Sequence, residues 1–210
     1  MAVFKRRDEN EIQQINQRQQ ELFDRLYRLF EPPLPKGVPE RLRQIVAAGC
    51  IIRGDTVLDV GAGTGILAPL IWRYEPARIY ACDLSEAMLQ QLRRNHPRVT
   101  ALLADVRDLD LPDASIDVVF INACYPNIVD KQGAFANIAR MVRPGGRLVV
   151  SHPLGRAFID GLKKSVSFPL DDFPQRETAG KILAAFGFNL LDFVDQTELY
   201  ILAGKKIDGA

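Results

Sequence analysis

The sequence predicts a three-layer α/β/α sandwich, in which a seven-stranded and mostly parallel sheet lies between two layers of helices. From residue 55 onward, apolar runs of strand length alternate with amphipathic helical patterns, which is typical of a parallel sheet covered on both faces. Near the end of the chain, two apolar runs are separated only by the polar pair Asp195-Gln196, which predicts a hairpin. One strand of the sheet is therefore expected to be antiparallel.

Individual elements follow from the periodicity of apolar residues. The expected strands are residues 56–60, 78–82, 99–104, 116–121, 147–151, 188–194 and 197–204. The helical patterns that separate them lie near residues 65–74, 85–95, 131–142 and 175–186. This alternation predicts helices on both faces of the sheet.

The N-terminal part of the chain predicts two helices that precede the sheet. Apolar residues recur at helical spacing over residues 8–31, and a proline-rich segment ends that helix. A second helix is expected between Pro39 and Gly49, because proline is favoured in the first helical turn. We therefore expect a helical extension or lid over residues 1–50 and a main domain over residues 51–206.

The charge balance argues against a nucleic-acid partner, and the short apolar runs argue against a membrane. The chain carries 27 Lys and Arg against 26 Asp and Glu, for a formal net charge of +1. Proteins that bind nucleic-acid phosphates usually show a clear basic excess, so no nucleic-acid partner is expected. No apolar run approaches the roughly 20 residues that span a bilayer, and the polar start does not resemble a signal peptide. No membrane association is expected either.

Cysteine and histidine usage indicates a reduced protein without a structural metal. The three cysteines are scattered along the chain, and His96 and His152 are the only histidines. Their spacing matches no metal-ligand motif. We expect a cytoplasmic protein that binds no metal.

A glycine-rich turn after the first expected strand is the most informative segment. Residues 57–65 read as a strand, then Gly61, Gly63 and Gly65, and then the start of a helix. Glycines adopt backbone angles closed to other residues and let the chain approach a ligand closely. Such a pattern is weak evidence alone, since it also occurs in simple tight turns.

Aspartates at three successive strand ends strengthen the case for a cofactor site. Asp59 would repel a pyrophosphate but suits a cationic amino-acid group. Asp83 stands where a carboxylate accepts both hydroxyls of an adenosine ribose, and Asp105 stands where it meets the adenine amino group. The ends of parallel strands meet at one edge of the sheet, where ligands bind. Each aspartate taken singly is equally well explained as a helix N-cap.

These residues resemble the motifs of class I S-adenosylmethionine-dependent methyltransferases, which have a Rossmann-like fold. Residues 57–65 resemble the first motif of that family, and residues 113–121 resemble the strand that holds its fourth motif. Residues 140–148 are similar to the segment R-x-L-x-P-G-G before the fifth strand. The resemblance covers about residues 40–204 and holds at the level of the superfamily.

The resemblance implies S-adenosylmethionine as cofactor, S-adenosylhomocysteine as product and a set of binding residues. Gly61 and its neighbours would approach the methionine part, Leu84 and Val106 would flank the adenine, and Met88 would add apolar contact or simply be core. The implied cofactor-binding residues are Asp59, Gly61, Ala62, Gly63, Gly65, Asp83, Leu84, Met88, Asp105, Val106 and Asn122.

Two alternatives stay open. A nicotinamide-dependent oxidoreductase shares the glycine turn, but it usually lacks Asp59 and needs Gly or Ala where Ile66 stands. A module that binds S-adenosylmethionine without turnover is the other alternative, because the sequence contains no unambiguous catalytic base.

Residues for the methyl acceptor are expected beyond the fourth and fifth strands. His152 is a candidate general base or a group that orients a substrate oxygen, and Tyr125 is a candidate to stack on a planar acceptor. Cys124 does not stand in the Pro-Cys pair of cytosine-carbon methyltransferases, so we interpret it as a wall of the pocket.

Further residues are expected to contact the substrate. Arg156 is a candidate for an acidic group of the acceptor, and Phe23 and Tyr27 are candidates for an apolar lid or a dimer contact. Because the chain has no large insertion for target recognition, we predict a small-molecule acceptor and a monomer or homodimer.

Overall fold

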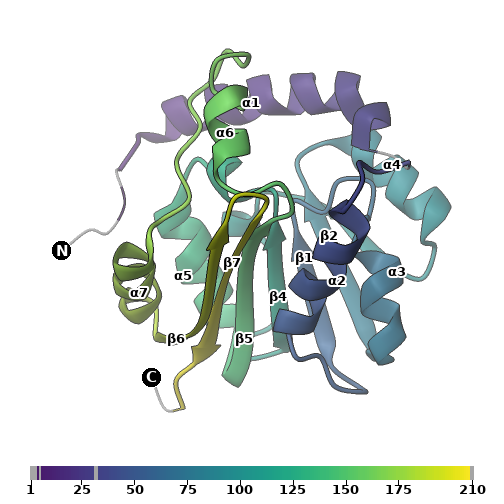
Figure 1. Cartoon of the computed structure of the whole chain (residues 1–210), viewed down its shortest axis with the longest axis vertical. Helices are drawn as coiled ribbons and strands as arrows, with labels where there is room; N and C mark the ends of the chain where they lie inside the picture. The colour runs from purple at the N-terminus through teal and green to yellow at the C-terminus, as the bar shows by residue number, and fades with distance from the viewer. Residues whose placement is uncertain (1–3, 5, 31–32, 209–210) are drawn as a thin grey trace.

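The computed structural model describes residues 4, 6–30 and 33–208, and it confirms the predicted α/β/α sandwich (Figure 1). Its seven-stranded sheet has the order β3-β2-β1-β4-β5-β7-β6. The strands are β1 (Thr56–Val60), β2 (Arg78–Asp83), β3 (Thr100–Leu103), β4 (Ile116–Asn122), β5 (Val142–His152), β6 (Phe188–Gln196) and β7 (Leu199–Lys206). Strand β7 pairs antiparallel with both β5 and β6, so the antiparallel strand lies inside the sheet rather than at its edge.

Helices cover both faces of the sheet. They are α1 (Glu9–Leu26), α2 (Val38–Ala48), α3 (Ala68–Ile71), α4 (Glu86–Asn95), α5 (Lys131–Met141), α6 (Ala157–Leu162) and α7 (Arg176–Ala185). Helices α2, α3 and α4 bury apolar residues against one face, while α5 and α7 pack on the other. Helix α1 lies across the end of the sheet, close to α4 (Figure 1).

Side-chain caps explain where several helices start. Asp8 accepts a hydrogen bond from the Glu11 amide at 2.8 Å and begins α1. Ser85 accepts from the Met88 amide at 3.1 Å and begins α4. These caps satisfy amides that have no partner within the helix, so they fix the residue at which each helix begins.

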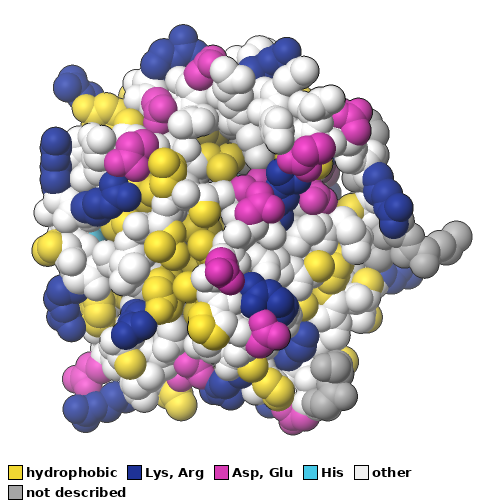
Figure 2. All heavy atoms as spheres, turned by 180° about the vertical axis from the view of Figure 1, so that it is seen from behind, with side chains coloured by type: hydrophobic (Ala, Val, Ile, Leu, Met, Phe, Trp, Pro, Cys, Tyr) yellow, Lys and Arg dark blue, Asp and Glu magenta, His cyan; other side chains and the backbone are white. Residues whose placement is uncertain are grey.

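In the described part of the chain, four short 3-10 helices connect the larger elements: η1 (Tyr27–Phe30), η2 (Trp72–Tyr74), η3 (Val106–Asp108) and η4 (Tyr125–Asn127). Between β3 and β4 the described chain forms only η3, so Tyr80 and Leu102 on that sheet face stay partly exposed. Figure 2 shows the side of the molecule that faces away from the viewer in Figure 1. Apolar side chains gather near its middle, with charged side chains beside them.

Several helices and strands begin or end at other residues than predicted. The hairpin turn lies at Thr197-Glu198 rather than Asp195-Gln196, because β6 keeps pairing with β7 as far as Gln196. Strand β5 starts earlier than predicted, since Val142 pairs with Ile116 before an irregularity in the ladder. The sequence did not predict α6, which has six residues and contains a glycine. The first helix is shorter than the predicted 8–31, because α1 ends at Leu26 and a 3-10 helix covers Tyr27–Phe30; residue 31 itself lies outside the described residues.

The N-terminal helices share the packing of the main domain. Leu42 and Ile45 of α2 are buried in the same cluster as the sheet residues Val57 and Val149. The division of the chain near residue 50 stays a prediction. Along the ranges that the structure describes, none of the helices is long and apolar enough to cross a membrane.

Candidate active site

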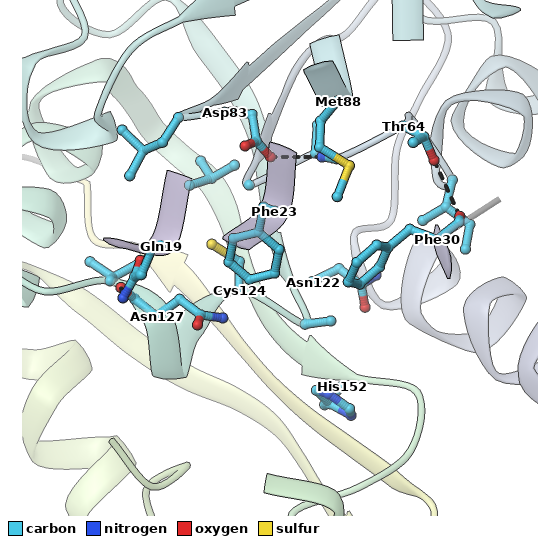
Figure 3. Close-up of a pocket in the computed structure, with 18 of the residues that line it drawn as sticks. Gln19, Phe23, Phe30, Thr64, Asp83, Met88, Asn122, Cys124, Asn127 and His152 are labelled. Atoms are coloured by element: carbon cyan, nitrogen blue, oxygen red, sulfur yellow. Dashed lines mark hydrogen bonds between the residues drawn. The ribbon is translucent and has the colours of Figure 1, made fainter. Parts of the chain in front are cut away.

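A cavity of about 350 Å³ opens at the carboxyl ends of the central strands, between α1, α2, α4 and α6 (Figure 3). It brings together residues that are far apart in the sequence. The predicted site residues that line it are Phe23, Gly61, Ala62, Gly63, Asp83, Leu84, Met88, Asp105, Val106, Asn122 and His152. Most of the implied cofactor-binding set therefore faces one space.

Other predicted site residues do not line this cavity. Gly65 faces His96, and Asp59 is buried behind the glycine turn. Tyr125 is 3% exposed and packs between Phe135 and Phe173. Its ring is part of the hydrophobic core and not of the cavity wall.

Arg156 and Tyr27 also lie outside the cavity. Arg156 pairs with Asp195 at 2.7 Å beside a separate, smaller hollow. The Tyr27 hydroxyl accepts a hydrogen bond from the Arg28 side chain. Their roles as substrate contacts stay predictions of the sequence.

The glycine turn is shaped by close contacts that only glycine permits. Gly61 has a φ of +64°, and a Cβ at this position would lie 2.2 Å from the Cys124 Sγ. The amides of Gly61 and Ala62 both donate to the Cys82 carbonyl, at 2.8 and 3.2 Å. Strand β2 and the loop after β4 therefore hold the turn against the cavity.

Asp83 joins this turn to helix α4. Its Oδ2 accepts from the Gly63 amide at 2.8 Å, and its Oδ1 accepts from the Ser85 amide at 2.9 Å. Burial raises the pKa of Asp83, and these amide donors oppose that rise. Its carboxylate is thus oriented at the edge of the cavity, where it suits ribose hydroxyls.

Asp105 is held by residues from two directions. Its Oδ1 accepts from the Arg107 amide at 3.1 Å, which makes it the N-cap of η3. Its Oδ2 accepts from the Asn16 side chain of α1 at 2.8 Å. Burial raises the pKa of this carboxyl as well. Asp105 therefore acts as an N-cap and faces the cavity at the same time.

Asp59 lacks any compensating partner among the described residues. It is 3% exposed, and burial together with the nearby Asp83 raises its pKa to about 8. A cationic group placed beside it would lower that pKa again. The chemistry of this position therefore fits the ammonium end of an amino acid.

We expect the pKa of Asp59 to make the stability of the cofactor-free protein depend on pH. Because the folded-state pKa lies above the usual value near 4, the folded protein holds this proton more tightly than the unfolded chain. The contribution to the free energy of unfolding therefore falls as the pH rises from about 4 to about 8. By pH 8, Asp59→Asn is expected to gain stability over the wild type on the order of a few kcal/mol.

Urea unfolding at pH 5 and at pH 8 measures this effect. Asp110→Asn, at an exposed position, is the matched control and is expected to show the same difference from wild type at both pH values. A gain in Asp59→Asn that is equal at the two pH values would show that Asp59 is not the titrating group.

Helix α1 supplies polar contacts that the sequence did not identify. Gln19 is 2% exposed and donates to the Asn127 carbonyl at 2.9 Å, while Asp24 accepts from the Ser85 hydroxyl and the Ala87 amide. Gln19 lies four residues after Ile15, on the same inward face of the helix. A polar residue within this apolar stripe was the feature of the sequence that could have predicted a buried polar contact.

The part of the cavity farther from Asp83 is apolar. Phe30, Leu34, Val38, Leu154 and Phe158 contribute its walls. Leu29, Phe30 and Phe158 also line the cavity and are 76%, 43% and 45% exposed, so they mark its opening to solvent. In Figure 3, His152 lies on the opposite side of the cavity from Asp83 and Met88.

Two cysteines in the wall are poor nucleophiles. Burial and the nearby carboxylates raise the pKa of Cys82 and of Cys124. A thiol is a weak nucleophile compared with its thiolate. Cys124 lines the cavity and packs on Gly61, in agreement with its interpretation as a pocket wall.

The sheet order and the glycine turn define a Rossmann-like domain, and the strand-end aspartates make its cavity a candidate cofactor site. A family model described as "Methyltransferase domain" matches residues 58–150. This match and the fold confirm the predicted resemblance of residues 58–150 to the class I S-adenosylmethionine-dependent methyltransferases.

Individual relatives agree with this class. The malonyl-[acyl-carrier protein] O-methyltransferase of Serratia marcescens is 34% identical over 118 residues, which cover 56% of this chain and 45% of that protein. The demethylmenaquinone methyltransferase of Tropheryma whipplei (strain Twist) is 39% identical over 109 residues, 49% of this chain and 45% of the relative. The chain thus spans about half the length of the curated relatives it matches.

Solved structures show the same fold at low identity. One is a Haloferax volcanii putative methyltransferase in complex with the Trm112 methyltransferase activator. It matches with a TM-score of 0.74 and 16% identity, over 93% of this chain and 99% of that chain.

Proposed function

We propose that this protein transfers the methyl group of S-adenosylmethionine to a small, apolar acceptor. One observation carries the proposal: a single cavity joins the glycine turn, Asp83 and Asp105 to an apolar region that opens to solvent. The first part suits the cofactor, and the second suits a separate apolar molecule.

The residues of the chain would bind and orient the two reactants. When bound, S-adenosylmethionine supplies an electrophilic methyl group on its sulfonium. Asp83 would accept hydrogen bonds from the ribose hydroxyls, and Asp105 would accept one from the adenine amino group. The ammonium end would lie against the glycine turn, with Asp59 buried on the other side of the turn. The apolar walls around Phe30 and Phe158 would exclude water and place the acceptor, which is a large part of catalysis for a displacement reaction.

The curated relatives leave the chemical identity of the acceptor open. Their names give two different acceptors, a malonyl-[acyl-carrier protein] and a demethylmenaquinone. The lining of the cavity therefore supports the choice of an apolar acceptor in this protein. A monomeric or homodimeric state and a cytoplasmic location remain predictions of the sequence.

Calorimetric titration of the purified protein tests the cofactor part of this proposal. We expect micromolar binding of S-adenosylmethionine and S-adenosylhomocysteine and no binding of NAD or NADP. Binding of a dinucleotide alone would reassign the protein to hydride transfer.

Turnover distinguishes an enzyme from a binding module. We expect labelled methyl groups to appear in an organic-soluble product when the protein and labelled S-adenosylmethionine are incubated with a panel of apolar phenols, quinols and enols. Tight cofactor binding without transfer to any of them would favour the module. Burial lowers the pKa of His152 to about 4, which makes it a weak base, and this favours that alternative.

A further inference from the structure

Several polar side chains of the cavity already form hydrogen bonds within the protein, and others do not. Asn16 donates to Asp105, Gln19 to the Asn127 carbonyl and Thr64 to the Phe30 carbonyl. Asn122 accepts from the Ser151 hydroxyl at 3.1 Å, whereas the Oδ1 of Asn127, which also lines the cavity, has no hydrogen-bond partner among the described residues. Among the described residues, none accepts a hydrogen bond from the Nε2 of His152, although this ring lines the cavity (Figure 3).

The hydrogen bond at Nδ1 determines which ring nitrogen of His152 carries the proton. The amide of Leu154 donates to Nδ1 at 3.1 Å, so Nδ1 must carry a lone pair. Turning the ring over would put a carbon there and leave this amide without an acceptor. The neutral imidazole therefore carries its hydrogen on Nε2.

The surroundings keep this ring neutral. His152 is 4% exposed, and its ring centroid lies 5.3 Å from that of Phe158 and 5.8 Å from that of Phe173. Burial lowers its pKa to about 4, and no charged group contributes to the shift. At neutral pH, a molecule in the apolar part of the cavity would meet an N–H donor and not a base.

We infer that the methyl acceptor is an apolar molecule with a hydrogen-bond-accepting oxygen, and that this oxygen binds the Nε2–H of His152. The inference rests on the proposed function and assigns its acceptor to carbonyl, phenol or enol compounds. It also assigns His152 the task of orienting the acceptor. In this tautomer Nε2 has no lone pair with which to remove a proton.

The tautomer is measured directly on the wild-type protein. The chain has only two histidines, so nitrogen-15 NMR of the imidazole rings, with His96→Asn for assignment, resolves the signals of His152. We expect a protonated Nε2 and an unprotonated Nδ1 at pH 7. A proton on Nδ1 would overturn the inference without affecting the proposed cofactor site.

Two substitutions separate binding of a ligand from support of the loop. In His152→Asn, the side-chain oxygen can still accept from the Leu154 amide, but no donor reaches the cavity. In His152→Gln, the amide group can present an N–H near the position of Nε2, but the contact with Leu154 is lost. A ligand-binding role and a merely structural role therefore predict opposite rankings of these variants.

The probes are 2-acetonaphthone and 2-isopropylnaphthalene, which have similar shapes and differ in one carbonyl oxygen. Each is titrated into wild type and both variants saturated with S-adenosylhomocysteine. We expect the affinity ratio of ketone to hydrocarbon to fall about 3- to 10-fold in His152→Asn and to be largely retained in His152→Gln.

Each outcome decides between the proposals. An unchanged ratio in His152→Asn, or no saturable binding of either probe to the loaded wild type, would overturn the inference. Failure of S-adenosylhomocysteine to bind would instead overturn the proposed function, and it is seen before any probe is added.

Discussion

Replacing Gly61 by alanine is expected to abolish detectable binding of S-adenosylhomocysteine and to destabilise the fold. The added Cβ would lie 2.2 Å from the Cys124 Sγ and 2.6 Å from its Cβ, so a shift of one flexible side-chain end cannot relieve the contact. The residue also has a φ of +64°, which strains any side chain. We expect a loss of roughly 2–5 kcal/mol in the free energy of unfolding. Urea unfolding and calorimetric titration measure the two effects.

Gly180→Ala provides the matched control. Gly180 lies inside α7, and a Cβ added there would meet no atom within 4 Å. Alanine at such a position is expected to leave cofactor affinity unchanged and to be neutral or slightly stabilising. Wild-type affinity in Gly61→Ala would show that the turn does not approach the cofactor.

Replacing Asp83 by alanine is expected to weaken binding of S-adenosylhomocysteine by about 10- to 100-fold, or roughly 1–3 kcal/mol. The variant leaves the ribose hydroxyls without their acceptor. It also leaves the amides of Gly63 and Ser85 without theirs, which loosens the turn and the start of α4. Both losses weaken cofactor binding, so calorimetric titration with S-adenosylhomocysteine measures their combined effect.

An aspartate outside the cavity serves as the comparison for Asp83. Asp110 is exposed in the loop that follows Asp105 and η3, and Asp110→Ala is expected to bind with wild-type affinity. A folded Asp83→Ala protein with unchanged affinity would remove this carboxylate from the cofactor site.

The shared cavity of the candidate cofactor-binding residues was predictable because the information for it is local. A glycine turn between a strand and a helix needs glycine for steric reasons, and these reasons are visible in consecutive residues such as Gly61 and Gly63. Asp83 and Asp105 follow parallel strands, and the geometry of such a sheet brings strand ends to one edge. The prediction for these positions thus needed only the order of strands and turns.

Tyr125 and Arg156 show where local information ended. Each follows a strand at the correct edge of the sheet, so the sequence predicted a side chain in the cleft. In the structure, the chain after β4 turns through η4 and carries the Tyr125 ring into the packing of α5. Arg156 instead finds Asp195 on the β6–β7 hairpin. The direction of a loop side chain depends on partners that are distant in the chain.

The contacts of α1 were hidden for the same reason. The hydrogen bond between Asn16 and Asp105 joins residues separated by 89 positions, and the bond between Gln19 and the Asn127 carbonyl spans 108. The sequence predicted that the N-terminal helices cover the cofactor site, but not which polar residues α1 would contact there. The polar partners become visible only when the helix is placed across the cavity.

The sequence by itself determined the fold class, the glycine turn and the strand-end carboxylates, because backbone stereochemistry and hydrophobic periodicity act over a few residues. The tertiary structure decided which side chains share the cavity, how Asp59 and His152 are buried, and which nitrogen of His152 carries the proton. These properties depend on desolvation and on long-range partners, and both arise only when distant segments of the chain pack together.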